Sequence, residues 1–215
     1  MTLDLFVGID LGSTTTKAVF IDDKARIMGR GITNSRSNYH LACQVAKEEG
    51  EINTRFKMLK DSLEKKSKKA NTEKMMEWLT SKFTLANHVR QLKALSEECL
   101  RLVDQNLWST TDKALYENAI TNIFTGLASS SEELFVPGAK PQSDFFRDLA
   151  TTQFLKQAES EVKTDGRLSF DKLVGLLDKA IIIVENKSFS SDFADYLDFA
   201  CKNVINQPQF KEQAQ

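Results

Sequence analysis

The residues best suited to chemistry lie in one run near the N-terminus, Gly8–Lys17. Gly12 can adopt backbone conformations that are closed to residues with a Cβ atom, and it lets another group approach the main chain. The three residues after it all carry a short hydroxyl and a backbone N–H: Ser13, Thr14 and Thr15. Successive donors in a tight turn form a concave array that suits phosphate oxygens. The sequence therefore predicts a phosphate-binding turn over residues 12–15.

Two charged residues flank this turn. Asp10 is placed to hold a hydrated Mg²⁺, a cation that prefers one or two carboxylates together with phosphate oxygens. Lys17 adds a compact positive charge beside the same turn. The run has neither the lysine-bearing P-loop pattern nor the three-glycine dinucleotide pattern. A structural hairpin with a polar turn is the alternative, but glycines, carboxylate, hydroxyls and lysine in a single run favour phosphate.

The elements that must position this turn are short strands. Two apolar, β-branched segments flank it, Leu5–Ile9 and Ala18–Ile21, and such a pattern predicts a β-hairpin. Residues 26–33 predict a third strand, reached by a turn at residues 22–24, so the three strands form an antiparallel meander. Ser35, Ser37 and Asn38 then supply side chains that can begin a helix.

The remainder of the chain is predicted to be helical. Apolar residues recur at helical spacing, which indicates about seven amphipathic helices joined by short loops. Two of them are expected between residues 71 and 103, one ending at Phe83 and the next starting at Leu85. We therefore expect a mostly α, α+β fold with three parts. These are residues 1–36 as the strand region, 37–206 as a helical domain and 207–215 as a frayed tail.

Composition narrows the class of protein and its compartment. A hydrophobic fraction of 41% with 27% charged residues is ordinary for a soluble globular protein, and a net charge of −1 offers no electrostatic case for nucleic acid or a membrane surface. No signal peptide opens the chain, and no stretch approaches the roughly 18 apolar residues of a membrane span. The three cysteines are widely spaced and odd in number, which favours free thiols in a reducing cytoplasm.

Other residues offer weaker signals. His40 and His88 are the only histidines, and neither stands at a metal-ligand spacing, so we expect surface or packing roles for both. The cysteines have no C-x-x-C spacing, and the sequence alone does not identify any of them as an iron–sulfur ligand.

The run Gly8–Lys17 resembles the first phosphate hairpin of the actin, sugar kinase and chaperone ATPase superfamily. Within that superfamily it is similar to the ATPases that drive low-potential electrons, namely the activators of 2-hydroxyacyl-CoA dehydratases and the ATP-binding subunits of benzoyl-CoA reductase. Further blocks resemble the larger of those reductase ATPase subunits: Gly29–Tyr39, Ile52–Phe56, Phe135–Ala139, Ser143–Asp148 and Asp178–Asn186.

The resemblance implies the start of an actin-like ATPase lobe that binds ATP and Mg²⁺. Asp10 would hold the metal through water, and Lys17 would neutralise charge. The backbone of Gly12–Thr15, with the Ser13 and Thr14 hydroxyls, would hold the β- and γ-phosphates. The implied partners are a second ATPase subunit, which shares a 4Fe–4S cluster, and reductase subunits that reduce benzoyl-CoA or a related acyl-CoA.

The chain supplies only the first of the nucleotide-binding segments that such a site needs. A second phosphate loop, a glycine-rich adenosine segment and the cluster cysteines are not found in the sequence. We therefore expect an N-terminal portion of a longer subunit that is not catalytically competent alone. The alternative is a non-catalytic helical interaction module with a vestigial phosphate hairpin. A sugar or acyl kinase fits less well, because the blocks after residue 29 do not resemble one.

Overall fold

A computed structural model describes residues 4–35, 38–66, 69–105, 109–139, 145–185, 192–207 and 210. Over these residues the chain is a mostly helical α+β protein in which a three-stranded antiparallel sheet precedes six helices. The predicted fold class is confirmed. The chain divides into two compact units, residues 1–80 with 188–215 and residues 81–187. Most of the tail expected over residues 207–215 lies outside the described residues, which include only Gln207 and Phe210 of it.

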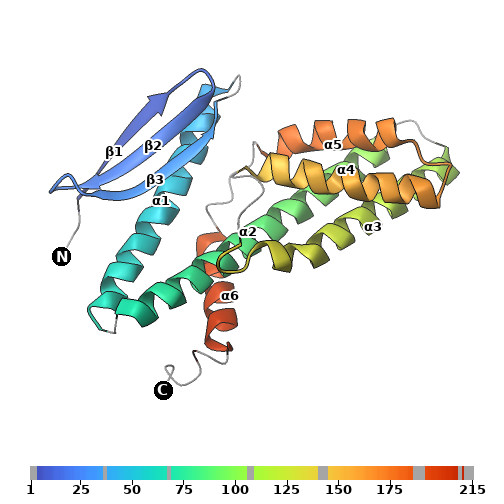
Figure 1. The fold of residues 1–215 in the computed structure, drawn as a ribbon. Helices are drawn as coiled ribbons and strands as arrows, with labels where there is room; N and C mark the ends of the chain where they lie inside the picture. The colour runs from blue at the N-terminus through green and yellow to red at the C-terminus, as the bar shows by residue number, and fades with distance from the viewer. Residues whose placement is uncertain are drawn as a thin grey trace. The chain divides into compact units, whose positions relative to one another are not determined.

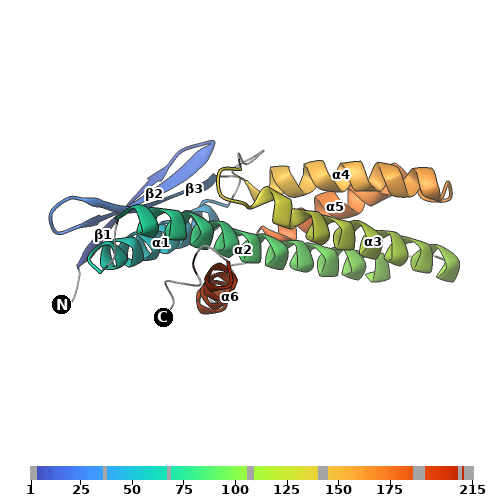
Figure 2. The same cartoon turned by 60° about the horizontal axis from the view of Figure 1, so that its bottom comes forward.

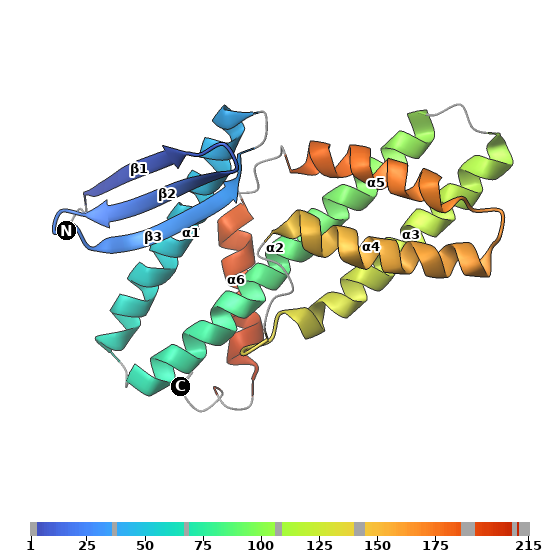
Figure 3. The ribbon, with the colours of Figure 1, turned by 45° about the horizontal axis from the view of Figure 1, so that its top comes forward.

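The sheet is the predicted meander. Its strands are β1 (Leu5–Leu11), β2 (Thr15–Asp22) and β3 (Ile27–Asn34), and they lie side by side in that order (Figure 3). β1 and β2 pair antiparallel, as do β2 and β3. Every residue of β1 is exposed, whereas β2 buries every second side chain. One face of β2 is therefore covered by the rest of the unit, and β1 is an edge strand.

Helix α1 (Tyr39–Glu64) covers that face of the sheet (Figure 1). Its first turn is capped by the Asn38 side chain, which accepts a hydrogen bond of 3.1 Å from the Leu41 N–H. Of the three residues predicted to begin a helix, Asn38 is the cap, Ser35 has another role described below, and Ser37 lies outside the described residues. Residues of β2, β3 and α1 share a small buried core: Ala18, Phe20, Met28 and Ala46.

Three glycines let α1 and β3 approach unusually closely. A Cβ atom on Gly31 would lie 2.0 Å from the Ala46 carbonyl oxygen, and one on Gly29 would lie 2.4 Å from the Gly50 carbonyl oxygen. On the helix itself, a Cβ atom on Gly50 would lie 2.5 Å from the Phe20 ring. Because none of these gaps can hold a side-chain carbon, the backbone of the helix rests directly on the backbone of the strand.

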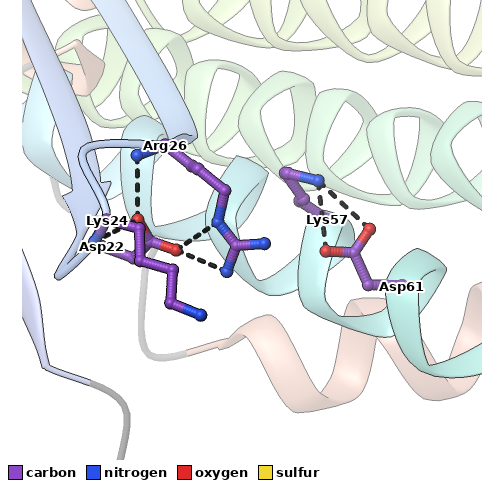
Figure 4. Close-up of polar contacts among 5 residues, drawn as sticks. All are labelled: Asp22, Lys24, Arg26, Lys57 and Asp61. Atoms are coloured by element: carbon purple, nitrogen blue, oxygen red, sulfur yellow. Dashed lines mark hydrogen bonds and ion pairs between the residues drawn. The ribbon is translucent and has the colours of Figure 1, made fainter.

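The second hairpin turn is held by a buried carboxylate. Asp22, whose side chain is fully covered, accepts hydrogen bonds from the Lys24 N–H at 3.0 Å and the Arg26 N–H at 2.8 Å (Figure 4). The Arg26 guanidinium adds an ion pair at 2.6 Å. Burial raises the pKa of Asp22, but the hydrogen bonds from Arg26 and Lys24 together outweigh it, so this pKa lies below its usual value.

Helix α6 (Phe193–Ile205) belongs to the same compact unit as the sheet. The Phe193 ring meets the Phe56 ring edge to face at a centroid distance of 6.3 Å. The Arg55 guanidinium carbon lies 4.6 Å from the centre of the Phe193 ring, which is a cation–π contact. Both contacts connect α6 to α1.

The other unit is a helical bundle. It contains residues 81–105 of α2 (Lys69–Gln105) together with α3 (Thr110–Leu134), α4 (Phe146–Thr164) and α5 (Phe170–Val184). Figure 2 shows α3, α4 and α5 running alongside one another. Its largest fully buried side chains are aliphatic or aromatic: Leu92, Leu95, Ile120, Ile123, Leu127, Phe154, Leu173, Leu177 and Ile181.

Helix α2 differs from the sequence-based expectation. The two helices expected between residues 71 and 103 are one continuous helix of 37 residues. The expected break, between Phe83 and Leu85, contains no glycine or proline, and nothing in it interrupts the backbone hydrogen bonds. This accounts for the six helices that the described residues form, in place of about seven. Among the described helices, none is both long and apolar enough to cross a membrane.

Candidate phosphate-binding turn

The predicted phosphate-binding turn is the tight connection between β1 and β2. The Gly12 N–H donates to the Thr15 carbonyl oxygen at 3.1 Å, which closes the hairpin and leaves Ser13 and Thr14 at its tip. Both tip residues are exposed, and Gly12 and Thr15 are half-buried. Because Ser13 and Thr14 are exposed, the tip of the turn is open to an approaching anion.

Gly12 is required for space and not for an unusual backbone angle. Within the described residues, only Ala25 and Gly138 have a positive φ, so the left-handed conformation that Gly12 was expected to permit is not used. A Cβ atom at Gly12 would instead lie 2.6 Å from the Thr15 carbonyl oxygen, closer than real Cβ contacts allow. The glycine therefore lets the two arms of the turn approach closely.

The carbonyl groups of the turn point toward Ser35, the residue directly after β3. The Gly12 carbonyl accepts from the Ser35 hydroxyl at 2.5 Å, and the Thr14 carbonyl accepts from the Ser35 N–H at 2.9 Å. In a trans peptide the C=O and the following N–H point in opposite directions. The N–H groups of Ser13 and Thr15 are therefore directed away from Ser35.

Asp10 and Lys17 stand beside this turn on adjacent strands. They are directly opposed in the β1–β2 register, so their side chains share one face of the sheet, with Cβ atoms about 5 Å apart. Both are exposed. Their neighbour Thr16 faces the α1 side and is fully buried, which places the two charged side chains on the opposite, open face. Among the described residues, no ion pair joins Asp10 to Lys17.

This arrangement fits the phosphate end of a magnesium–nucleotide complex. A carboxylate without a protein cation partner within the described residues can hold hydrated Mg²⁺, and one or two carboxylates are the usual protein contribution to such a site. The Ser13 N–H, which faces away from Ser35, can donate to phosphate oxygens, and Lys17 can balance their charge. All six predicted site residues, Asp10, Gly12, Ser13, Thr14, Thr15 and Lys17, lie at this end of the hairpin.

The three cysteines lie on three different helices, two in the unit of the sheet and one in the helical unit. Cys43, Cys99 and Cys201 are free thiols, and Cys99 is completely buried in the helical unit, where burial strongly raises the pKa of its thiol. Over the part of the chain that the structure describes, no three His, Cys, Asp or Glu side chains gather as metal ligands.

Sequence reasoning missed two residues of this site, Thr16 and Ser35. Both are buried with 0% exposure, and their hydroxyl oxygens lie 2.9 Å apart. Ser35 was interpreted as a helix start, because serine is common there. Its contact with Gly12 spans 23 positions and depends on the return of β3, so no local pattern reveals it.

Comparisons of the chain with models of known protein families, with curated proteins and with solved structures gave no match.

Proposed function

We propose that this chain carries the phosphate-binding hairpin of a cytoplasmic ATPase subunit that couples ATP hydrolysis to low-potential electron transfer. The acceptor would be benzoyl-CoA or a related acyl-CoA, reached through a second ATPase subunit and reductase subunits. The nucleotide part of this proposal is supported chiefly by the open hairpin end, where carbonyls turn toward Ser35 while Asp10 and Lys17 stand exposed. The electron-transfer part rests on the sequence blocks after residue 29 that resemble the larger ATPase subunit of benzoyl-CoA reductase.

Each residue of the turn has a distinct task in this proposal. ATP supplies the phosphoanhydride bond whose hydrolysis releases the free energy. The Ser13 N–H at the tip of the turn donates to phosphate oxygens, and Asp10 orients the water shell of Mg²⁺. Lys17 places its ammonium near the same oxygens and offsets their charge. These groups act by position and electrostatics, because phosphoryl transfer needs little covalent help from protein.

A solution NMR titration tests the nucleotide part directly. The amide resonances of the chain are followed while Mg²⁺ and inorganic triphosphate are added, a probe that lacks the nucleoside for which no segment is found. We expect the Ser13, Thr14 and Thr15 amides to shift, with a dissociation constant on the order of 1 mM, because only part of a complete site is present. Unchanged shifts at all three amides would contradict the proposal.

Two matched variants show whether the binding is specific. Asp10→Asn removes the carboxylate beside the turn and should abolish the dependence of binding on Mg²⁺. Asp23→Asn is the control, because Asp23 is also an exposed aspartate at a hairpin end, on the turn between β2 and β3. It should bind like the wild type. In the ATPase subunit proposed here, Asp10→Asn should abolish ATP-driven electron transfer and leave the fold intact, and unchanged ATPase activity would refute the role of Asp10.

The alternative function is a helical interaction module that never binds nucleotide. Its helices would provide the contact surface, and the hairpin would be a structural remnant. Two observations separate the alternatives. An amide titration without any response at residues 12–15 favours the module, whereas a reading frame that continues past Gln215 into a second phosphate loop and a cysteine-bearing segment favours the ATPase subunit.

A further inference from the structure

Ser35 makes three hydrogen bonds at the base of the turn, although it lies 20 positions or more from the tip in sequence. Its hydroxyl contacts the Gly12 carbonyl at 2.5 Å, its N–H contacts the Thr14 carbonyl at 2.9 Å, and its hydroxyl lies 2.9 Å from the Thr16 hydroxyl. Ser35 and Thr16 are both fully buried. One buried residue thus holds both arms of the exposed turn.

Counting protons shows which hydroxyl is the donor in the contact between Ser35 and Thr16. A carbonyl oxygen can only accept, so the single Ser35 hydroxyl proton goes to Gly12. The Ser35 oxygen must then accept from Thr16, whose hydroxyl is the donor of the pair. Thr16 therefore orients the Ser35 hydroxyl, and Ser35 in turn orients the Gly12 carbonyl.

We propose that Ser35, held in orientation by Thr16, is a positioning residue that keeps the Ser13 N–H directed outward, toward a bound phosphate. This inference rests on the function proposed above. If the Gly12–Ser13 peptide rotated by half a turn, the Gly12 carbonyl and the Ser13 N–H would exchange directions. The anion would then face a carbonyl oxygen in place of an N–H. The Ser35 hydroxyl opposes that rotation, because it would lose its acceptor inside the protein.

The two bonds from Ser35 to the turn differ in a way that provides an internal control. The bond to Gly12 comes from the side chain, whereas the bond to Thr14 comes from the backbone and persists in any non-proline variant. Ser35→Ala should therefore reorient the Ser13 N–H and leave the Thr15 N–H as it is. A general loss of stability would not change the orientation of the Ser13 N–H while leaving that of the Thr15 N–H unchanged.

The experiment measures N–H residual dipolar couplings of the turn, without ligand, and the affinity for inorganic triphosphate with Mg²⁺. Ser35→Ala should change the Ser13 coupling, preserve the Thr15 coupling and weaken triphosphate binding about tenfold, the effect of one charge-assisted hydrogen bond. Ser131→Ala is the matched control. Ser131 is equally buried and also donates its hydroxyl to a backbone carbonyl, that of Leu127 at 2.7 Å, but it lies in the helical unit.

A second pair of variants keeps the test valid if Ser35→Ala fails to fold. Thr16→Val removes the donor that orients Ser35 and preserves side-chain shape, so binding should weaken about two- to fivefold. Thr16→Ser retains the hydroxyl and should bind like the wild type.

The outcomes separate the positioning role from the proposed function. A Ser13 N–H that keeps its orientation in both Ser35→Ala and Thr16→Val overturns the positioning role. A reoriented Ser13 N–H with weakened triphosphate binding supports it. If wild-type amides never respond to triphosphate, the proposed function fails, and the dipolar couplings still decide whether Ser35 sets the peptide orientation.

Discussion

His88 of α2 yields the sharpest prediction about pH. The residue is 4% exposed, and its ring contacts two aromatic rings, with centroid distances of 5.0 Å to Phe135 and 5.5 Å to Phe146. Its buried Nε2 atom has no hydrogen-bond partner within the described residues. A second proton on the ring would place a cation among apolar groups, and burial accordingly lowers the pKa of His88 from 6.5 to about 4.

This lowered pKa determines the sign and size of the effect. Between pH 6.5 and about pH 4 the unfolded chain binds a proton at His88 and the folded chain does not, so the free energy of unfolding falls as the pH falls. At about 1.4 kcal/mol per pKa unit, the loss reaches about 3 kcal/mol near pH 4. It is already about 2 kcal/mol at pH 5 relative to pH 7.

Two assays check this prediction. An NMR titration of the histidine ring resonances measures the pKa of His88 in the folded chain. Urea denaturation at pH 7 and pH 5, followed by circular dichroism, compares the wild type with His88→Gln, which cannot be protonated. The wild type should lose about 2 kcal/mol more than the variant over this interval. His40→Gln, a change of an exposed histidine near the start of α1, is the control and should retain the wild-type pH dependence.

Either of two results would refute the reasoning about burial. One is a His88 ring that titrates near the usual histidine value. The other is a His88→Gln variant whose free energy of unfolding falls as steeply with acid as that of the wild type.

Three further predictions concern stability. Gly31→Ala should destabilise the chain by about 1–3 kcal/mol in urea denaturation, because its Cβ atom would lie 2.0 Å from the Ala46 carbonyl oxygen; a variant as stable as the wild type would contradict the close helix–strand contact. Gly175→Ala, inside α5, should instead stabilise by about 0.5–1 kcal/mol, because the new carbon meets nothing within 4 Å beyond its own stretch of helix; a loss of stability there would contradict the open space. Asp22 has a lowered folded-state pKa, so its stabilisation is present above its unfolded value near 3.8 and disappears as the pH falls below it. Asp22→Asn should therefore weaken the chain at neutral pH and flatten its acid denaturation curve, and an unchanged curve would count against the hydrogen bonds from Arg26.

The strands and the candidate turn could be predicted because their signals are local. Apolar residues of the hairpin strands flank a glycine and three hydroxyls, and the residues that oppose each other across a two-residue turn follow from counting. The strands extend closer to the turn than predicted, to Leu11 and from Thr15, and this places Asp10 opposite Lys17. Helix α1 likewise begins where Asn38 can cap it.

What could not be predicted depends on segments far apart in sequence. Gly29 and Gly31 belong to a block whose purpose the sequence did not explain, because the helix that rests on them passes at Ala46 and Gly50. Ser35 is similar, since a serine after a strand suggests a cap until the return of β3 places it under the turn. The continuity of α2 was not predicted, although no glycine or proline lies between Phe83 and Leu85 to break the helix.

The exposed edge strand β1 has a consequence for the behaviour of the protein in concentrated solution. β1 leaves main-chain hydrogen-bonding groups along its outer side and exposes apolar side chains on both faces, with Phe6 59% and Leu11 52% exposed. Such an edge is a template on which another copy can add a strand. Concentrated samples should therefore scatter light increasingly with time, and a lysine substituted at Val7 should slow that growth, because a charge on an edge strand opposes stacking of copies.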